Sequence, residues 1–269
     1  MNEIKQIHSL QNSLVKKILL LKGKSRERKR SGQFVLEGQR ELQLAIKGGY
    51  SIETLLYLPE IIAERAVLEL FTDKKGIPEL IQVSKPVYQK IAYRESTEGV
   101  LAIAKCKAHS LDGILLKKNP LILVAEAPEK PGNIGAILRT ADAANLDAVL
   151  IANPKGDLYN PNIIRSSVGC VFTNTIGVGS TYEIIDFLKE NKIKIHCAAL
   201  SASETYTSTD LTKASAIVVG TESTGLSKEW LDNSSQNILI PMQGEIDSMN
   251  VSVSAAILIF EAKRQRNFK

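Results

Sequence analysis

Three polar segments of this chain carry side chains that could bind and orient a ligand. They span residues 133–139, 220–225 and 240–254, and each comes after an apolar stretch of the sequence. The first contains an amide and a guanidinium, the second a carboxylate, and the third several hydroxyls and a second amide. Groups of this kind can bind anions, orient hydroxyl groups and handle protons.

The first segment offers Asn133 and Arg139. Asn133 could cap a helix that begins near Gly135, which is the simplest role for an amide at this place. Arg139 lies among the apolar residues of that helix. An unpaired buried charge is very costly, so we expect Arg139 to need a phosphate or a carboxylate. Asp142, three residues later on the same helix, is an alternative partner.

The second and third segments add an acid, a hydroxyl and an amide. Glu222 follows a wholly apolar strand, so its carboxylate is expected to point into the crevice at the sheet edge. Gly220 would let a ligand approach the backbone closely, and Gly225 would permit a sharp turn. Ser248 and Asn250 lie in a turn of about nine residues, whereas an ordinary strand-to-helix turn needs about two to six.

Several common kinds of active site are not supported by the sequence. It contains no G-x-G-x-x-G after its first long strand, no Walker lysine motif, no H-E-x-x-H and no G-x-S-x-G. The histidines are isolated and are expected to have structural or surface roles: His8, His109 and His196. The cysteines are widely spaced and odd in number, which favours reduced thiols over a disulfide framework or a metal site: Cys106, Cys170 and Cys197.

Alternating apolar strands and helices predict an α/β fold for the second part of the chain. The expected strands are residues 121–127, 148–152, 175–178, 194–200, 216–220 and 237–240. The expected helices are residues 135–144, 161–168, 182–191, 228–232 and 250–266. The strands are continuous apolar runs, which favours a parallel sheet buried on both faces. Because the carboxyl ends of parallel strands meet at one edge, the three polar segments should lie together there.

The first part of the chain predicts a separate, smaller α/β domain. Its expected strands are residues 34–37, 52–58, 81–83 and 100–104, and its expected helices are residues 14–21, 39–47 and 61–71. A basic hinge is expected at residues 23–32. The polar stretch 108–120 is the best linker candidate, so the predicted domains are residues 1–107 and 121–269.

The positive charge of the protein is concentrated in its first part. The net charge is +5, but residues 1–110 carry a balance of +7 and residues 111–269 a balance of −2. The densest block runs from Lys16 to Arg30. Such a surface attracts phosphate backbones by releasing counterions, although a solvated helix face explains it equally well. No apolar run is long enough for a membrane span and no signal-peptide pattern is present, so we expect no membrane partner and a cytoplasmic protein.

The three polar segments together form a pattern that no single motif carries. The patterns Asn-x-Gly-x-x-x-Arg, G-x-E-x-x-G and Ile-Pro-Met-x-Gly with Ser-x-Asn-Val-Ser occur in this order over about residues 120–266. This combination resembles the SpoU-type (TrmH-like) RNA ribose 2′-O-methyltransferases of the SPOUT superfamily, with Met249 where that family usually has leucine. Residues 34–40, Phe-Val-Leu-Glu-Gly-Gln-Arg, resemble the substrate-binding domain of these enzymes.

This resemblance implies a fold, a cofactor and partners. The fold would combine a parallel sheet and a deep trefoil knot with a small α/β RNA-binding domain that resembles a ribosomal-protein fold. The cofactor would be S-adenosyl-L-methionine, and the substrate an RNA, with 23S rRNA as the leading candidate. No metal would take part. The enzyme would be a homodimer, with the helix at residues 250–266 as the expected contact.

The resemblance also assigns roles to individual residues. Those assigned to the chemistry are Asn133, Arg139, Glu222, Ser248 and Asn250. Those assigned to the cofactor are Leu200, Gly220, Ile240, Met242 and Met249. Those assigned to RNA are Lys24, Arg26, Arg28, Arg30 and Arg40.

The role of Arg139 and the substrate leave alternatives open. Arginine has an ordinary pKa of about 13.8, so its neutral form at pH 7 is disfavoured by roughly 9 kcal/mol. We therefore expect Arg139, oriented by Glu222 and Asn133, to bind a target phosphate and to lower the pKa of the ribose hydroxyl. Ser248 and Asn250 would position the ribose. Other readings are a non-catalytic ribosome-assembly factor, a tRNA 2′-O-methyltransferase and a base methyltransferase.

Overall fold

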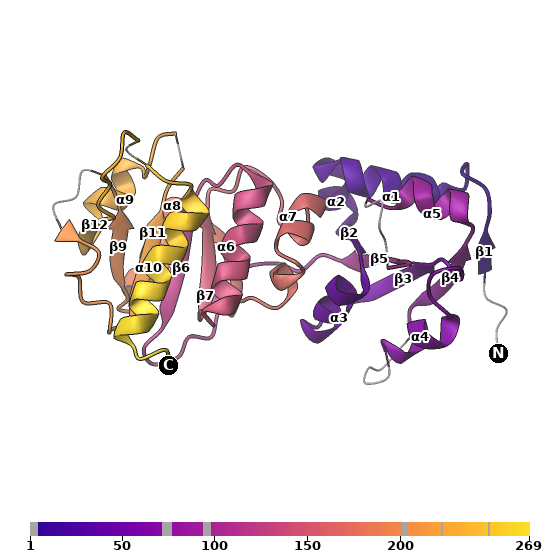
Figure 1. Ribbon diagram of the computed structural model, residues 1–269, viewed down its shortest axis with the longest axis horizontal. Helices are drawn as coiled ribbons and strands as arrows, with labels where there is room; N and C mark the ends of the chain where they lie inside the picture. Colours follow the sequence, from indigo (N-terminus) through magenta and orange to yellow (C-terminus); the bar gives the residue numbers. More distant parts are fainter. Residues whose placement is uncertain (1–4, 72–76, 94–97, 201–203, 222, 247) are drawn as a thin grey trace. The chain divides into compact units, whose positions relative to one another are not determined.

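The chain folds as two units, and the second is interrupted by a segment that packs in the first. The computed structural model describes residues 5–71, 77–93, 98–200, 204–221, 223–246 and 248–269 (Figure 1). Unit 1 comprises Met1–Lys107 and Asp157–Thr173, and unit 2 comprises Ala108–Gly156 and Asn174–Lys269. Residues 157–173, predicted for the second domain, therefore lie in unit 1, and the predicted linker 108–120 lies in unit 2.

Unit 2 is built on a seven-stranded sheet in which the described strands pair only in parallel. The strand order is β10-β12-β9-β11-β6-β7-β8. The strands are β6 (Leu121–Glu126), β7 (Ala148–Ala152), β8 (Ile176–Gly179), β9 (Lys194–Ala198), β10 (Glu204–Thr205), β11 (Ser215–Val219) and β12 (Gln236–Leu239). The predicted parallel sheet is confirmed. Strand β10 was not predicted, because two residues are too few to show a period.

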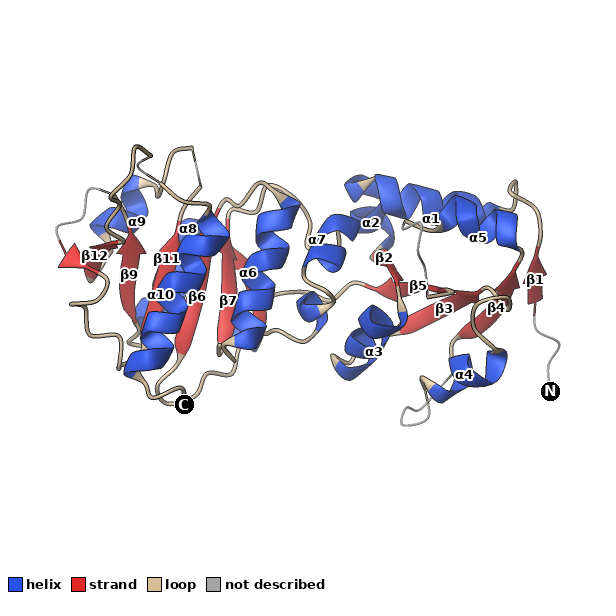
Figure 2. Ribbon diagram, in the orientation of Figure 1, coloured by secondary structure: helices blue, strands red, loops and turns tan. Residues whose placement is uncertain are grey.

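Helices cover both faces of this sheet (Figure 2). They are α6 (Pro131–Ala143), α8 (Thr181–Glu190), α9 (Lys228–Asp232) and α10 (Val251–Gln265), with the 3-10 turn η1 (Leu111–Gly113). Helices α6 and α10 lie side by side on one face. On the other face, Ile184 and Trp230 belong to a buried cluster with side chains of β6 and β7. Leu111, Ile114 and Leu116 pack against that cluster, which explains why the predicted linker belongs to unit 2.

Unit 1 contains a five-stranded mixed sheet in the order β1-β4-β3-β5-β2. The strands are β1 (Lys5–Ile7), β2 (Gln33–Glu37), β3 (Ile52–Tyr57), β4 (Glu79–Val83) and β5 (Val100–Lys105). The helices are α1 (Ser13–Gly23), α2 (Ser25–Ser31), α3 (Gln39–Lys47), α4 (Glu64–Glu69), α5 (Lys85–Ile91), α7 (Pro161–Ser166) and the 3-10 turn η2 (Cys170–Phe172). The basic stretch predicted as a hinge is helix α2, which ends at Gly32 in the left-handed conformation. In neither unit do the described residues contain a helix that could cross a membrane.

An aromatic cluster holds residues 157–173 in unit 1. The ring of Phe34 on β2 stacks on Tyr159 and Phe172, with centroid distances of 4.4 and 5.6 Å. The hydroxyls of Tyr50 and Tyr159 lie 3.3 Å apart. Gly48 has no room for a side chain, because a Cβ there would lie 2.0 Å from the carbonyl oxygen of Phe172. This segment is therefore part of the core of unit 1.

Candidate active site

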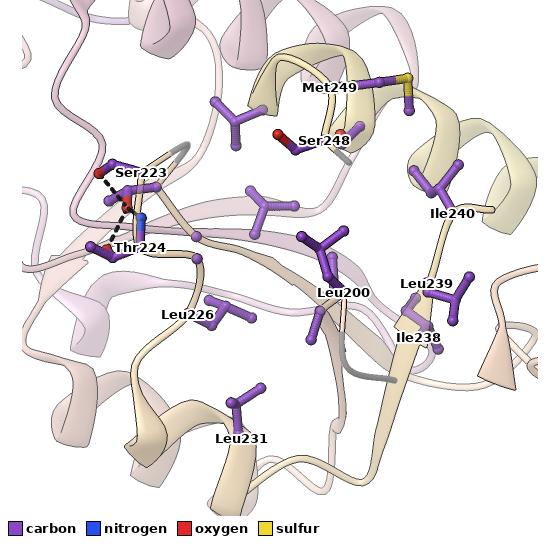
Figure 3. Close-up of a pocket in the computed structure, with 18 of the residues that line it drawn as sticks. Leu200, Ser223, Thr224, Leu226, Leu231, Ile238, Leu239, Ile240, Ser248 and Met249 are labelled. Carbon is purple, nitrogen blue, oxygen red and sulfur yellow. Dashed lines mark hydrogen bonds between the residues drawn. The ribbon is translucent and has the colours of Figure 1, made fainter. Parts of the chain in front are cut away.

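A pocket of about 470 Å³ lies at the carboxyl ends of β9, β11 and β12 (Figure 3). Its volume is within the range of small-molecule sites, about 300–1,000 Å³. The described lining residues carry no charged side chain. The five residues that the resemblance assigned to the cofactor all line it: Leu200, Gly220, Ile240, Met242 and Met249. The sheet topology thus brings together three segments that are far apart in sequence.

One wall of this pocket is the turn that follows β11. Thr221 and Gly225 exchange two backbone hydrogen bonds of 3.1 Å, and Gly225 has a φ of +67°. The sharp turn predicted at Gly225 is therefore confirmed. A Cβ on Gly220 would lie 2.2 Å from the Gly225 carbonyl oxygen, so the backbone of the turn itself requires glycine there. The sequence analysis had explained Gly220 only by the close approach of a ligand. Glu222 lies outside the described residues.

Helix α10 begins at the pocket with Asn250 as its N-cap. The Asn250 Oδ1 atom accepts hydrogen bonds from the Ser252 amide at 3.0 Å and from the Ser252 hydroxyl at 2.6 Å. Its amide group donates to Asn133 Oδ1 at 3.1 Å. Two predicted site residues, 117 positions apart, are thus in direct contact. Ser248, just before the helix, lines the same pocket.

The predicted capping role of Asn133 is wrong. Helix α6 begins at Pro131, with Lys130 as its N-cap, so Asn133 already lies in the first helical turn. The Pro131 ring suits this first position, because its missing N–H has no helical partner to lose. The side chain of Asn133 is therefore available to meet Asn250 across the two helix starts.

A second pocket, of about 260 Å³, adjoins the first and is more polar in its lining residues. Asn133, Glu126 and Lys130 contribute to it. The two pockets share four lining residues: Gly220, Thr221, Ser223 and Val251. A ligand in the uncharged pocket would thus meet a second ligand near Asn133.

Arg139 is exposed, which corrects the expectation that it lies among buried residues. It shares an exposed stripe of α6 with Gly132 and Asp142, so the apolar neighbours in sequence point elsewhere. No ion pair joins Arg139 to Asp142, and among the described residues the Arg139 side chain has no hydrogen-bond partner. It lines neither of the two pockets.

Glu126, at the end of β6, is a site residue that the sequence analysis missed. It is 6% exposed and lines the second pocket. One carboxylate oxygen accepts from the Ser227 amide at 2.8 Å and the other from the Thr181 hydroxyl at 3.2 Å. Asn153, after β7, donates in turn to the Thr181 hydroxyl at 2.9 Å. Its place directly after the apolar residues of β6 could have identified Glu126 as a candidate site residue from the sequence.

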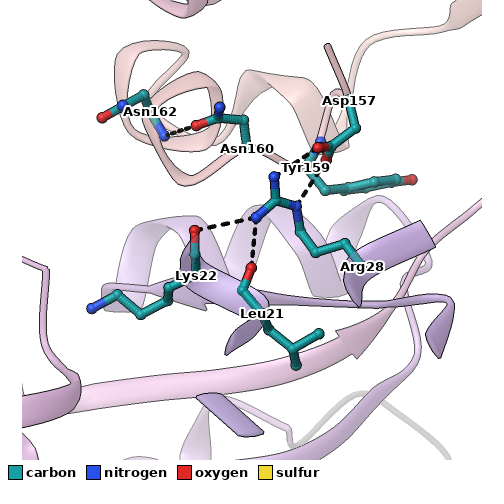
Figure 4. A network of polar contacts seen from close by, with 7 residues as sticks. All are labelled: Leu21, Lys22, Arg28, Asp157, Tyr159, Asn160 and Asn162. Atoms are coloured by element: carbon teal, nitrogen blue, oxygen red, sulfur yellow. Dashed lines mark hydrogen bonds and ion pairs between the residues drawn. The ribbon is translucent and has the colours of Figure 1, made fainter. Parts of the chain in front are cut away.

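Arg28 is buried and cannot be the RNA contact that was predicted. It is 3% exposed, and its guanidinium donates to both carboxylate oxygens of Asp157, at 3.0 and 2.7 Å (Figure 4). It also donates to the carbonyls of Leu21 and Lys22 at the end of α1. A guanidinium suits this place because helix ends leave carbonyl groups without partners. The other predicted RNA contacts are exposed: Lys24, Arg26, Arg30 and Arg40.

Cysteine and metal chemistry find no support in the described residues. Burial raises the pKa of Cys106 to about 11 and that of Cys197 to about 12, so neither thiol is a ready nucleophile at neutral pH. The described part of the chain has no group of three or more His, Cys, Asp or Glu residues arranged around a possible metal ion.

Comparison with known proteins agrees with this arrangement. Residues 120–260 match the model of the SpoU rRNA Methylase family, and residues 12–102 match that of the MRM3-like substrate binding domain. The chain is 28% identical over 253 residues to the 23S rRNA (uridine(2479)-2′-O)-methyltransferase of Streptomyces viridochromogenes, covering 91% of this chain and 88% of that protein. It is 32% identical over 241 residues to the 23S rRNA (guanosine-2′-O-)-methyltransferase RlmB of Haemophilus influenzae, covering 82% and 97%.

The fold is also that of a solved structure with a bound cofactor. The SpoU methyltransferase AviRb from Streptomyces viridochromogenes, in complex with AdoMet, superposes with a TM-score of 0.87 at 27% identity. The match covers 96% of this chain and 99% of that one. The similarity therefore extends over both units.

Proposed function

The chain belongs to the SpoU rRNA methylase family, as an S-adenosylmethionine-dependent RNA ribose 2′-O-methyltransferase, and we propose that it methylates 23S rRNA. The observation that carries this proposal is the pair of adjoining pockets at the strand ends. One is uncharged in its described lining, and the other holds Asn133. Two ligands, a cofactor and an acceptor, would meet at their shared wall.

The first pocket fits S-adenosylmethionine by its chemistry. This cofactor has no phosphate, and the described lining has no lysine or arginine that would attract one. Leu200, Ile240 and Met249 offer apolar surface for an adenine ring (Figure 3). When bound, the cofactor supplies a methyl group attached to a positively charged sulfur.

The two amides beside the pockets are suited to hold the acceptor. Asn250 is fixed as the N-cap of α10, and Asn133 is fixed in the first turn of α6. Their contact therefore presents polar groups in a defined position, and positioning alone can contribute much of a rate enhancement. Ser248 would complete the group that orients the ribose. The ribose hydroxyl forms an O–C bond with the methyl group and releases its proton to solvent, while the electron pair of the broken C–S bond stays with sulfur.

Arg139 would bind a phosphate of the RNA. Its exposed guanidinium has no acidic partner among the described residues, so it is open to a large anionic substrate. Guanidinium groups bind phosphate with two parallel hydrogen bonds. Held at that phosphate, outside the two pockets, its positive charge would also favour the alkoxide that develops as the ribose hydroxyl loses its proton.

Three finer features complete the proposal. We propose a homodimer in contact through α10, where Val253 and Phe260 are 47% and 42% exposed, whereas Leu258 is buried within unit 2. The turn between Ile240 and Asn250 would form part of a trefoil knot, as the family fold implies. The cytoplasm is the compartment that we propose for this activity.

The decisive test uses labelled S-adenosylmethionine. The protein is incubated with total RNA from a strain that lacks it, and alkali-resistant linkages are mapped in the labelled RNA. We expect one methylated ribose in 23S rRNA, and labelling that is slower by about 10²–10³ with Arg139→Ala. Label in tRNA alone would show that the substrate is wrong. Cofactor binding without transfer to any RNA would favour the ribosome-assembly role.

A further inference from the structure

Tyr93 in unit 1 is an exposed ring with two cations beside it. Its side chain is 43% exposed. The Lys22 ammonium lies 5.3 Å from the ring centroid, and the guanidinium carbon of Arg165 lies 5.8 Å from it. Lys22 lies on α1, Tyr93 follows α5, and Arg165 lies on α7. Cations are attracted to an aromatic face, which keeps both charges near one another despite their repulsion.

Arg165 holds this place because α7 is anchored in unit 1. The buried ion pair between Arg28 and Asp157 secures the start of the segment (Figure 4). The Tyr93 hydroxyl donates to Asn162 Oδ1 at 2.5 Å, one helical turn before Arg165. Arg165 lies within the stretch matched by the methylase model, yet its contacts belong to the unit matched by the substrate-binding model.

The charges around Tyr93 do not cancel. In the described lining of the crevice, the acidic side chain is that of Glu37, and it accepts a hydrogen bond from the Tyr93 amide at 2.5 Å. Burial lowers the pKa of Lys22, and Glu37 partly opposes this. Arg165 is exposed and forms no ion pair with any described residue. Among the described residues of the crevice, Lys22 and Arg165 thus face one carboxylate, so their charges give this part of the surface a positive balance.

The shape of the site favours a phosphate over a base. The crevice lined by Lys22, Glu37, Tyr93 and Arg165 has a volume of only about 30 Å³, far below the roughly 300 Å³ of the smallest usual ligand sites. A nucleobase cannot enter it. A phosphate group can bind at the surface, where the guanidinium presents its donors.

We propose that Arg165, supported by Tyr93 and Lys22, binds a backbone phosphate of the RNA substrate. The proposal rests on the proposed function, which makes RNA the substrate. It extends the RNA-binding surface of unit 1 to a segment from the second half of the chain. Helix α2, whose Arg28 pairs with Asp157, also carries exposed basic residues: Arg26, Lys29 and Arg30.

The test compares two exposed arginines of unit 1. Arg165→Ala removes the proposed contact, and Arg65→Ala on α4 is the matched control, because the Arg65 side chain is 91% exposed and its ion pair in the described part of the chain is with Glu69, four residues away. Binding of 23S rRNA transcribed in vitro is measured by filter retention at several salt concentrations. We expect Arg165→Ala to weaken binding about five- to tenfold and to reduce the salt slope by about one. Arg65→Ala should leave both unchanged. Equal behaviour of the two variants would overturn the proposal.

Three further variants separate the charge of Arg165 from the support that the Tyr93 ring gives it. Arg165→Lys keeps the charge but loses the planar fork, and it should recover part of the affinity. Tyr93→Phe keeps the ring and should bind RNA more tightly than Tyr93→Ala. Thermal unfolding of each variant checks that unit 1 is folded.

A calorimetric titration with S-adenosylmethionine distinguishes the two proposals. Arg165→Ala should bind this cofactor as the unaltered protein does, because the described residues that line the proposed cofactor pocket all lie in unit 2. If the unaltered protein binds neither cofactor nor RNA, the proposed function fails. If it methylates RNA but Arg165→Ala does so with equal RNA affinity, only the phosphate site fails.

Discussion

Arg28 in unit 1 and Arg139 in unit 2 occupy opposite environments. The Arg28 guanidinium is buried and donates to Asp157 and to two helix-end carbonyls. The Arg139 guanidinium is exposed and finds no partner among the described residues. An arginine that its own chain satisfies holds two segments together, whereas one without an internal partner is open to a ligand. The same type of side chain thus supports the fold in unit 1, whereas in unit 2 we propose that it binds the substrate.

The largest effect should follow from breaking the buried pair of unit 1. Asp157→Ala leaves the Arg28 charge buried without its carboxylate, so we expect a loss of about 3–5 kcal/mol in the free energy of unfolding. Urea unfolding measures it. Glu27→Ala, which breaks the exposed pair with Arg30, is the control and should cost less than about 1 kcal/mol. Similar losses for both would contradict the structural role of Arg28.

Arg139→Ala should lower the activity and leave the stability almost unchanged. We expect kcat for RNA methylation to fall by about 10²–10³, the usual cost of losing one group that stabilises developing charge. The unfolding free energy should change by less than about 0.5 kcal/mol, because the side chain is exposed. Single-turnover methylation and thermal unfolding measure the two quantities. Substantial activity of Arg139→Lys with a pH profile that rises through a lysine titration would instead indicate an ordinary base.

The buried side chain of His196 should make the stability of unit 2 depend on pH. His196 is 2% exposed, and neither ring nitrogen has a hydrogen-bond partner among the described residues. Burial lowers its pKa to about 4, with a smaller contribution from Lys194 and an opposing one from Asp210. The pKa of His196 in the folded protein lies below its ordinary value of about 6.5. The contribution of neutral His196 to the free energy of unfolding is therefore fully present above pH 6.5. It should be lost as the pH falls towards 4, by up to about 3 kcal/mol.

His196→Leu should flatten this part of the stability profile between pH 6.5 and 4.5. His8→Ala, at an exposed position, is the control and should leave the profile unchanged. Urea unfolding at each pH provides the measurement. An unaltered pH profile for His196→Leu would show that this histidine is not held in the neutral form.

The smallest effect should come from changing Glu126, whose carboxylate on β6 accepts a hydrogen bond from the Ser227 amide, next to Leu226 of the pocket lining. Glu126→Ala removes the acceptor for the Ser227 amide, so we expect S-adenosylmethionine to bind about tenfold more weakly by calorimetry. Asp147→Ala is the control at the other end of β6, where Asp147 accepts from the Leu121 amide at 2.8 Å. It should destabilise unit 2 and leave the cofactor affinity unchanged. Rescue by Glu126→Gln would show that the acceptor, and not the charge, is needed.

Much of the second unit could be predicted, because its signals are local. Continuous apolar runs predicted parallel strands, and the helix at residues 228–232 has the expected bounds. The five residues assigned to the cofactor came from the family resemblance, and the structure places them at one pocket. Helix α5 and strand β1 were missed, and the start of α6 was placed too late. Short elements carry too few residues for a clear period.

Residue environments could not be predicted in the same way. Arg28 lies in a basic stretch that suggested solvent or RNA, but its partner Asp157 is 129 residues away. Arg139 lies among apolar neighbours that suggested burial, but it faces outward from α6. Charge density along a chain does not report which side chain a distant segment will cover.

The order of apolar runs and polar turns in the sequence determined a parallel sheet with its ligand-binding segments at one edge. This follows because hydrophobic periodicity acts within a few residues and parallel strands align their carboxyl ends. The tertiary structure alone decided that residues 157–173 belong to unit 1, that Arg28 is buried and that Asn133 meets Asn250. These contacts join residues more than 100 positions apart, and they depend on how the packed elements fill space rather than on any local pattern.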